Sequence, residues 1–143
     1  MVLLIPGHQF LFSPLVANEC HPACVGKIVE LSQTCAVTRL TDQQIDANQF
    51  LDLIAAHGLG DGETECLSIC IARPGSLLCC DDRKAREVAK GLLGPGRVIG
   101  SLRLLKWSVT AGLISAGEAY NKYDAMKNTG GFLPDVSLEW FNT

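Results

Sequence analysis

The chain has 143 residues, of which 48% are hydrophobic and 19% are charged. This length predicts a single domain over residues 1–143, and the composition excludes an intrinsically disordered chain. The formal net charge of −3 is unevenly divided: residues 1–81 hold three bases and nine acids, and residues 82–143 hold nine bases and six acids. The basic second half could face a polyanion, or it could be an ordinary solvated helical surface, because it contains no tight basic cluster.

Seven cysteines are present, and no two of them form a CxxC pair. Cys66, Cys70 and Cys79 stand in apolar segments, which predicts buried free thiols. An odd cysteine count in a chain of this size does not suit a disulfide scaffold, so we expect a reducing, cytoplasmic compartment. The longest apolar runs are too short for a membrane span, and Met1–Ile5 lack the basic segment of a signal peptide.

The first third of the sequence alternates strand and helix patterns. Residues 9–13 alternate as a short strand, and Ser13-Pro14 predicts the start of a helix that runs to about Cys20. A helical stripe made by Val25, Ile28, Val29 and Leu31 follows the interruption at His21-Pro22. Residues 34–40 are β-rich and predict a second strand.

The middle of the sequence predicts two helices and a buried strand. Thr41 and Gln44 match a capping box before a helix that ends at Gly58, with Ile45, Phe50, Leu53 and Ile54 on its apolar face and Leu51 as a further candidate for that face. A Gly-rich loop leads to a helix that begins near Glu63 and stops at Arg73-Pro74-Gly75. The continuous apolar run 77–80 then predicts a buried parallel strand.

The last part of the sequence predicts four helices around one more strand. A helix over 83–93 closes at Gly94-Pro95-Gly96, and 98–100 form a short strand. Ser101 is expected to cap a helix ending at Gly112, and Ser115 with Glu118 forms a second capping box for a helix that reaches Gly130. A final short helix is expected over 134–141. Strands alternating with helices indicate an α/β fold with a parallel sheet.

Acidic side chains follow the apolar run 77–80. Ligand sites of parallel α/β sheets collect at the carboxyl ends of strands, where Asp81 and Asp82 are placed. Two adjacent carboxylates there invite a hard cation such as Mg²⁺ or Mn²⁺. An equally simple interpretation is a helix N-cap, which Asp favours. One member of the pair could serve each purpose.

A second acidic feature opens the helix that begins near Glu63. Glu63 and Glu65 stand in its first turn, where the helix dipole favours negative charge. Glu65 borders the apolar face and could look into the same cleft as Asp81, in which case the two carboxylates would share one cation. A plain surface carboxylate is the competing interpretation.

Other clusters carry weaker signals. Cys20, His21, Cys24 and Cys35 could hold zinc, but their spacing is not that of a standard zinc site. Trp107 and Trp140 fit helical core or interface positions.

Three spaced motifs resemble a branch of the PIN-domain family. They are a helix start in residues 60–72 (GDGETECLSICIA), a strand end in 77–86 (LLCCDDRKAR) and a helix in 98–114 (VIGSLRLLKWSVTAGLI). The segment Phe12 to Glu19 is similar to the family's Pro-x-x-Val-x-x-Glu segment, and 130–141 also suit the family. The likeness covers nearly the whole chain.

The resemblance implies a PIN-like three-layer sandwich, in which a short parallel sheet is flanked by helices. It also implies a Mg²⁺- or Mn²⁺-dependent endoribonuclease, of the kind found as toxins of toxin–antitoxin pairs. Glu65 matches the family's middle-helix acid, and Asp81 or Asp82 matches its later strand-tip acid. These three residues would be the catalytic metal ligands, and Arg83 and Arg86 would contact RNA phosphate, although Arg86 could equally pair with an acid.

The sequence departs from this family at its amino-terminal end. No Asp or Glu precedes Glu19, so the family's first-strand Asp has no counterpart and we expect an N-terminally incomplete domain. Met1–Ile5 could replace the missing strand but bring no carboxylate. We therefore expect little or no RNA cleavage. The alternative function is a catalytically inactive PIN-like module that binds or dimerises. The expected partners are RNA, an antitoxin protein and a second copy of the chain.

Overall fold

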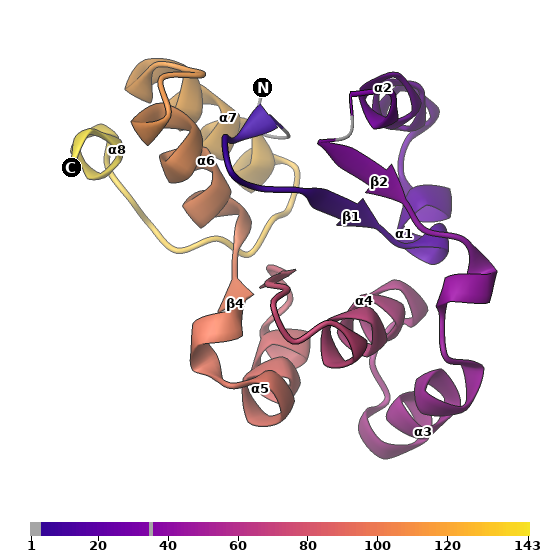
Figure 1. The fold of residues 1–143 in the computed structure, drawn as a ribbon. Coiled ribbons are helices and arrows are strands. Elements are labelled where there is room, and N and C mark those ends of the chain that lie inside the picture. Colours follow the sequence, from indigo (N-terminus) through magenta and orange to yellow (C-terminus); the bar gives the residue numbers. More distant parts are fainter. Residues whose placement is uncertain (1–3, 35) are drawn as a thin grey trace.

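The computed structural model describes residues 4–34 and 36–143, and four short strands within them form two separate parallel pairs. β1 (Phe10–Phe12) pairs with β2 (Val37–Arg39), and β3 (Leu78–Cys79) pairs with β4 (Val98–Ile99). Figure 1 shows β1 and β2 beside α1 and α2, whereas β4 lies between α5 and α6. The α/β class with parallel strands is confirmed, and the parallel strands are divided between two small sheets.

The first strand pair is packed by two helices, α1 (Pro14–Glu19) and α2 (Pro22–Ser32). Ser13 Oγ accepts a hydrogen bond from Val16 N at 3.2 Å, which confirms the predicted start of α1. Ile28 and Leu31 of α2 are buried against Val37 of β2. Val29 is 40% exposed, so its predicted place on the inner stripe is wrong.

After β2 the chain forms one 3₁₀ turn and then a helix. The capping box of Thr41 and Gln44 is present, but it caps the 3₁₀ turn η2 (Asp42–Gln44) and not a long helix. The helix α3 (Ala47–His57) starts one turn later, because the Asp46 carboxylate accepts from Gln49 N at 3.0 Å. Gly58 closes α3 with a φ of 56°, a left-handed conformation that favours glycine.

The second strand pair is packed by α4 (Asp61–Ala72) and α5 (Arg83–Leu93), and the 3₁₀ turn η3 (Pro95–Arg97) leads into β4. The largest apolar cluster of this region consists of Leu53, Leu67, Cys70, Leu78, Ala89 and Val98. Only Leu78 of the run 77–80 is fully buried, and Leu77 and Cys79 are exposed. The prediction of a buried strand is therefore wrong, and among residues 4–34 and 36–143 β3 pairs only with β4.

Three helices complete the fold: α6 (Ser101–Thr110), α7 (Ala116–Asn128) and α8 (Leu138–Asn142). Gly100 is the N-cap of α6 and Ser101 is its first residue, so the predicted cap is shifted by one position. The capping box of Ser115 and Glu118 is confirmed. The last helix begins at Leu138, four residues later than predicted. The α6–α8 core contains Leu102, Leu105, Ala119, Tyr123 and Phe141.

The cysteines that the structure describes are free thiols. Cys70 is buried as predicted and Cys66 is half-buried, whereas the prediction of a buried Cys79 is wrong. Cys35, part of the weak zinc pattern, lies outside the described residues, as do residues 1–3 of the segment that could replace a strand. Within residues 4–34 and 36–143, no helix is long and apolar enough to cross a membrane.

Candidate functional site at the tips of the second strand pair

Asp81 is held at the tip of β3 by the first residue of α6. Its Oδ1 accepts from Ser101 N at 2.9 Å, and its Oδ2 accepts from the Ser101 hydroxyl. Both carboxylate oxygens therefore face the amino-terminal end of α6, where the helix dipole favours negative charge. The bond spans twenty positions of sequence and ties the β3–α5 turn to the β4–α6 turn.

Arg86 lies beside Asp81 and Gly100. Its Nη1 donates to Cys80 O at 2.7 Å, so it contacts the backbone at the strand tip and not an acid. A Cβ placed on Gly100 would lie 2.8 Å from Asp81 Oδ1 and 3.0 Å from Arg86 Nη1. Glycine at this position thus allows an acid and a base to approach the same backbone.

Asp82 and Arg83 occupy the first positions of α5. Asp82 is the N-cap, and its Oδ1 accepts from Ala85 N at 2.7 Å. Asp82 therefore has the helix-capping role that the sequence analysis gave as the alternative to metal binding. Arg83 is exposed, and within residues 4–34 and 36–143 its side chain makes no hydrogen bond or ion pair. Its guanidinium is available to solvent at this end of the strand pair.

Glu65 is directed toward the first strand pair. It is only 5% exposed, and its Oε1 accepts from Leu15 N at 2.8 Å. Leu15 is in the first turn of α1, so the carboxylate satisfies a backbone donor that the helix leaves unpaired. Glu65 therefore stabilises the contact between α4 and α1, a role that the sequence interpretation did not include.

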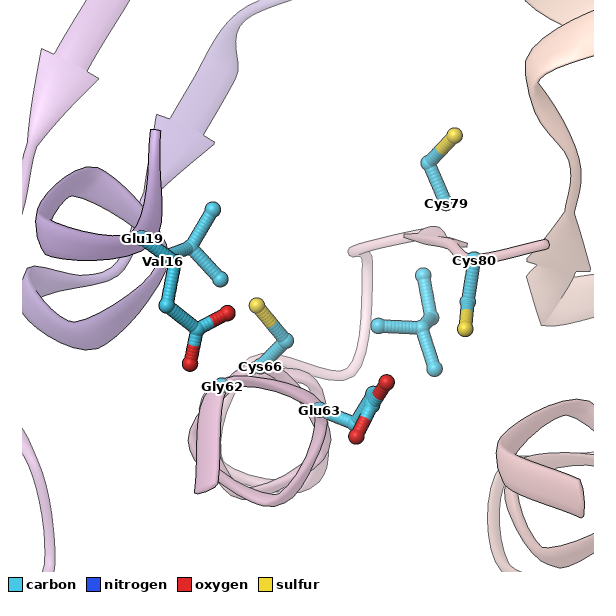
Figure 2. A pocket seen from close by; sticks show the side chains of 8 residues that line it. Val16, Glu19, Gly62, Glu63, Cys66, Cys79 and Cys80 are labelled. Carbon is cyan, nitrogen blue, oxygen red and sulfur yellow. The ribbon is translucent and has the colours of Figure 1, made fainter. Parts of the chain in front are cut away.

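A cavity of about 150 Å³ lies between α1, α4 and β3, and it is lined by Glu19 and Glu63, but not by Glu65. Figure 2 shows Glu19 on the α1 side, Cys66 and Glu63 on α4, and Cys80 on the β3 side. The Glu19 carboxylate lies directly over Gly62, where an added Cβ would be 2.9 Å from one of its oxygens.

The thiols of this cavity are poorly suited to nucleophilic chemistry. Burial raises the pKa of Cys66 to about 11, even though a hydrogen bond of 3.7 Å from its Sγ to Ser13 Oγ acts in the opposite direction. Burial also raises the pKa of Cys80. The thiolate is the nucleophile and the metal ligand, so a raised pKa disfavours both roles.

The predicted acids are engaged with three different helices. Glu65 binds the start of α1, Asp81 binds the start of α6, and Asp82 caps α5. Among residues 4–34 and 36–143, no group of three or more His, Cys, Asp or Glu side chains has a geometry that could hold a metal ion. The donor set of the described residues thus does not fit the three-acid metal centre that the resemblance implies.

A second cavity, of about 230 Å³, borders Asp81 and Arg86. Gly100 and Leu102 form part of its wall, and Phe132 and Leu133 contribute from the segment that follows α7. The sequence interpretation missed Ser101 as the partner of Asp81, and it missed Phe132. For Ser101 a signal existed, since a serine after a strand-tip glycine can satisfy a neighbouring acid. No local pattern marks Phe132.

A family model described as a PIN domain matches residues 7–140 of the chain. The comparison with curated proteins and the comparison with solved structures each found no match.

Proposed function

The chain belongs to the PIN domain family, and from this premise we propose that it binds RNA at the edge that carries Asp81, Arg83 and Arg86. PIN domains are in general nucleases, are generally dependent on divalent metals and commonly bind RNA. The observation that supports this edge is a cavity lined in part by Arg86. Three positions before Arg86, Arg83 is exposed at the start of α5, and its side chain has no ion-pair partner within residues 4–34 and 36–143.

Charge favours RNA at this edge in spite of the nearby acids. Asp81 is compensated by two donors of Ser101, so its repulsion of a phosphate is reduced. Arg86 uses Nη1 for the backbone, which leaves the rest of its guanidinium fork for a phosphate oxygen. Arg83 adds an exposed positive charge, and the segment 82–143 has more basic than acidic residues.

A more specific function than RNA binding is that of a Mg²⁺- or Mn²⁺-dependent endoribonuclease, with Glu65, Asp81 and Asp82 as its catalytic acids. The separate helix partners of these three carboxylates do not support a shared cation. A cation at such a site would orient water and neutralise the charge that develops on phosphate, and this needs convergent ligands. We propose that RNA binding is retained and that hydrolysis is slow.

Binding and cleavage are measured side by side on the full chain. We expect a fluorogenic RNA to be cleaved little with Mn²⁺ present, while anisotropy of a labelled short RNA detects binding that weakens as salt rises. Glu65→Gln and Asp81→Asn are the test variants. Robust Mn²⁺-dependent cleavage that both substitutions abolish would contradict slow hydrolysis. A wild-type chain that binds no RNA would contradict the proposed function itself.

A toxin role, an antitoxin partner, self-association and a cytoplasmic location are parts of the same proposal, motivated by the family resemblance and by the free thiols. Growth arrest on expression, relieved by a co-expressed partner protein, tests the toxin role. The sedimentation of the purified chain tests self-association. Normal growth and a monomer at all concentrations would remove both parts and leave RNA binding as the function.

A further inference from the structure

Phe132 is the most exposed large apolar side chain among the described residues, with 95% of its surface accessible. It stands in the segment between α7 and α8, which is largely exposed except for Leu133 and Val136. Leu133 and Val136 lie against the α6–α8 core. Single exposed apolar side chains are common on protein surfaces, so the significance of this ring depends on what lies beside it.

Hydrogen bonds hold the backbone on both sides of this ring. Before it, Gly131 N donates to Met126 O at 3.1 Å, and a Cβ on Gly131 would lie 2.8 Å from that same oxygen. After it, the Tyr123 hydroxyl donates to Pro134 O at 3.1 Å and accepts from Val136 N at 3.3 Å. The exposed ring is thus presented from an anchored segment, which is what a preorganised binding group requires.

The ring borders the cavity that contains Asp81 and Arg86. Its lining combines the charged Arg86 with the apolar side chains of Phe132, Leu102 and Leu133. The other strongly exposed apolar side chain, Leu51 on α3 at 62%, borders neither cavity. The position of Phe132 next to a charged cavity therefore favours a ligand that has both a flat face and an anion.

A nucleotide has these two properties. Bases of single-stranded nucleic acid stack on exposed aromatic side chains, whereas the bases of a duplex are already stacked on one another. Arginine recognises phosphate through its planar fork of donors. We propose that Phe132 stacks on an unpaired nucleobase while Arg86 contacts an adjoining phosphate. This proposal rests on the proposed RNA-binding function.

The experiment compares the wild-type chain with Phe132→Ala, Phe132→Trp and the control Leu51→Ala. The binding of each protein to a labelled single-stranded RNA and to a labelled duplex RNA is measured by anisotropy. Both RNAs carry 2′-O-methyl groups, which prevent cleavage. We expect Phe132→Ala to weaken single-strand binding about tenfold, in line with the alanine-substitution effects of stacking aromatics, and to leave duplex binding unchanged. Phe132→Trp should retain wild-type affinity because indole also stacks, and Leu51→Ala should have no effect.

The outcomes separate this inference from the function on which it rests. Single-strand binding by Phe132→Ala that equals wild type, with wild-type binding intact, overturns the stacking role alone. No binding by the wild-type chain overturns both proposals. Sedimentation of the same samples adds a third result: a wild-type dimer that Phe132→Ala converts to a monomer would assign the ring to contact between copies and overturn the nucleobase proposal.

Discussion

The two parallel strand pairs end in different chemistry. After β1, the Ser13 hydroxyl is buried and caps α1, and after β2, Thr41 forms a box with Gln44. After β3 and β4, an acid and a base border an open cavity, and Ser101 compensates the acid. The carboxyl end of a parallel strand is therefore not enough to make a site. The polar groups that follow the strands of the first pair stabilise its own turns, whereas Asp81 and Arg86, which follow β3, border a cavity.

The two pairs also differ in the apolar core beneath them. Leu67 is 1% exposed in the cluster under β3 and β4, and Leu31 is buried in the smaller cluster under β2. We expect Leu67→Ala to lower the free energy of unfolding by about 2–5 kcal/mol, because the removed methyl groups leave a cavity. Leu31→Ala should fall nearer the lower end of that range, because its cluster is smaller and can relax toward solvent.

Urea unfolding followed by circular dichroism measures both values, and the exposed Leu51→Ala serves as the control, with a change of less than about 0.5 kcal/mol expected. A loss for Leu31→Ala that equals or exceeds the loss for Leu67→Ala would show that the first pair contributes as much stability as the second. The size of each apolar cluster would then not determine how much it contributes to stability.

Local signals in the sequence predicted much of this fold. The bounds of α5, the start of α1 and the capping box of α7 depend on residues within one or two helical turns, so the sequence displays them directly. The strand interpretation was less successful for residues 77–80. The exposure of Cys79 depends on which strands lie beside β3, and no pattern inside the run contains that information.

The candidate site was predicted in part, for a similar reason. The sequence correctly placed Asp81 and Asp82 at a strand tip. It indicated the hydrogen-bonding role of Asp82 but not the partner of Asp81. Asp82 caps its own helix, a local role, whereas the Asp81–Ser101 bond depends on how β4 lies beside β3. Glu65 accepts a bond from a residue fifty positions earlier, so its role in joining α4 to α1 follows from tertiary packing alone.

Two helix-capping side chains, one after each strand pair, test whether the two pairs differ in RNA binding. Ser13→Ala and Asp82→Ala each remove a side chain that accepts from a helix amide, so each should lower stability by about 1 kcal/mol. Their effects on RNA should differ. Asp82→Ala removes an exposed negative charge beside Arg83, and we expect RNA affinity at low salt to rise about two- to fivefold. Ser13→Ala should leave it unchanged.

Thermal unfolding and RNA anisotropy on the same samples provide the two readouts. Asp82→Asn is a useful third variant, because asparagine retains the cap while it removes the charge. We expect it to keep wild-type stability and to show the increased affinity. Reduced RNA affinity in both Asp82 variants would instead indicate that this carboxylate assists binding, and it would favour the metal-ligand assignment over the cap.

The smallest expected effect concerns the contact between α1 and α4, where the two halves of the molecule meet. Alanine is more favourable than glycine in a helix by about 0.5–1 kcal/mol. Gly91 of α5 has open space where a Cβ would be placed, so Gly91→Ala should gain most of this stability. At Gly62 of α4 the new methyl group would meet the Glu19 carboxylate at 2.9–3.2 Å. Glu19 is exposed and can rotate away, so we expect Gly62→Ala to lie within about 0.5 kcal/mol of wild type.

Urea midpoints at constant slope measure both changes. A clear destabilisation by Gly62→Ala would mean that Glu19 is fixed in its position over α4, and the double variant Gly62→Ala/Glu19→Ala should then recover the stability that Gly62→Ala loses.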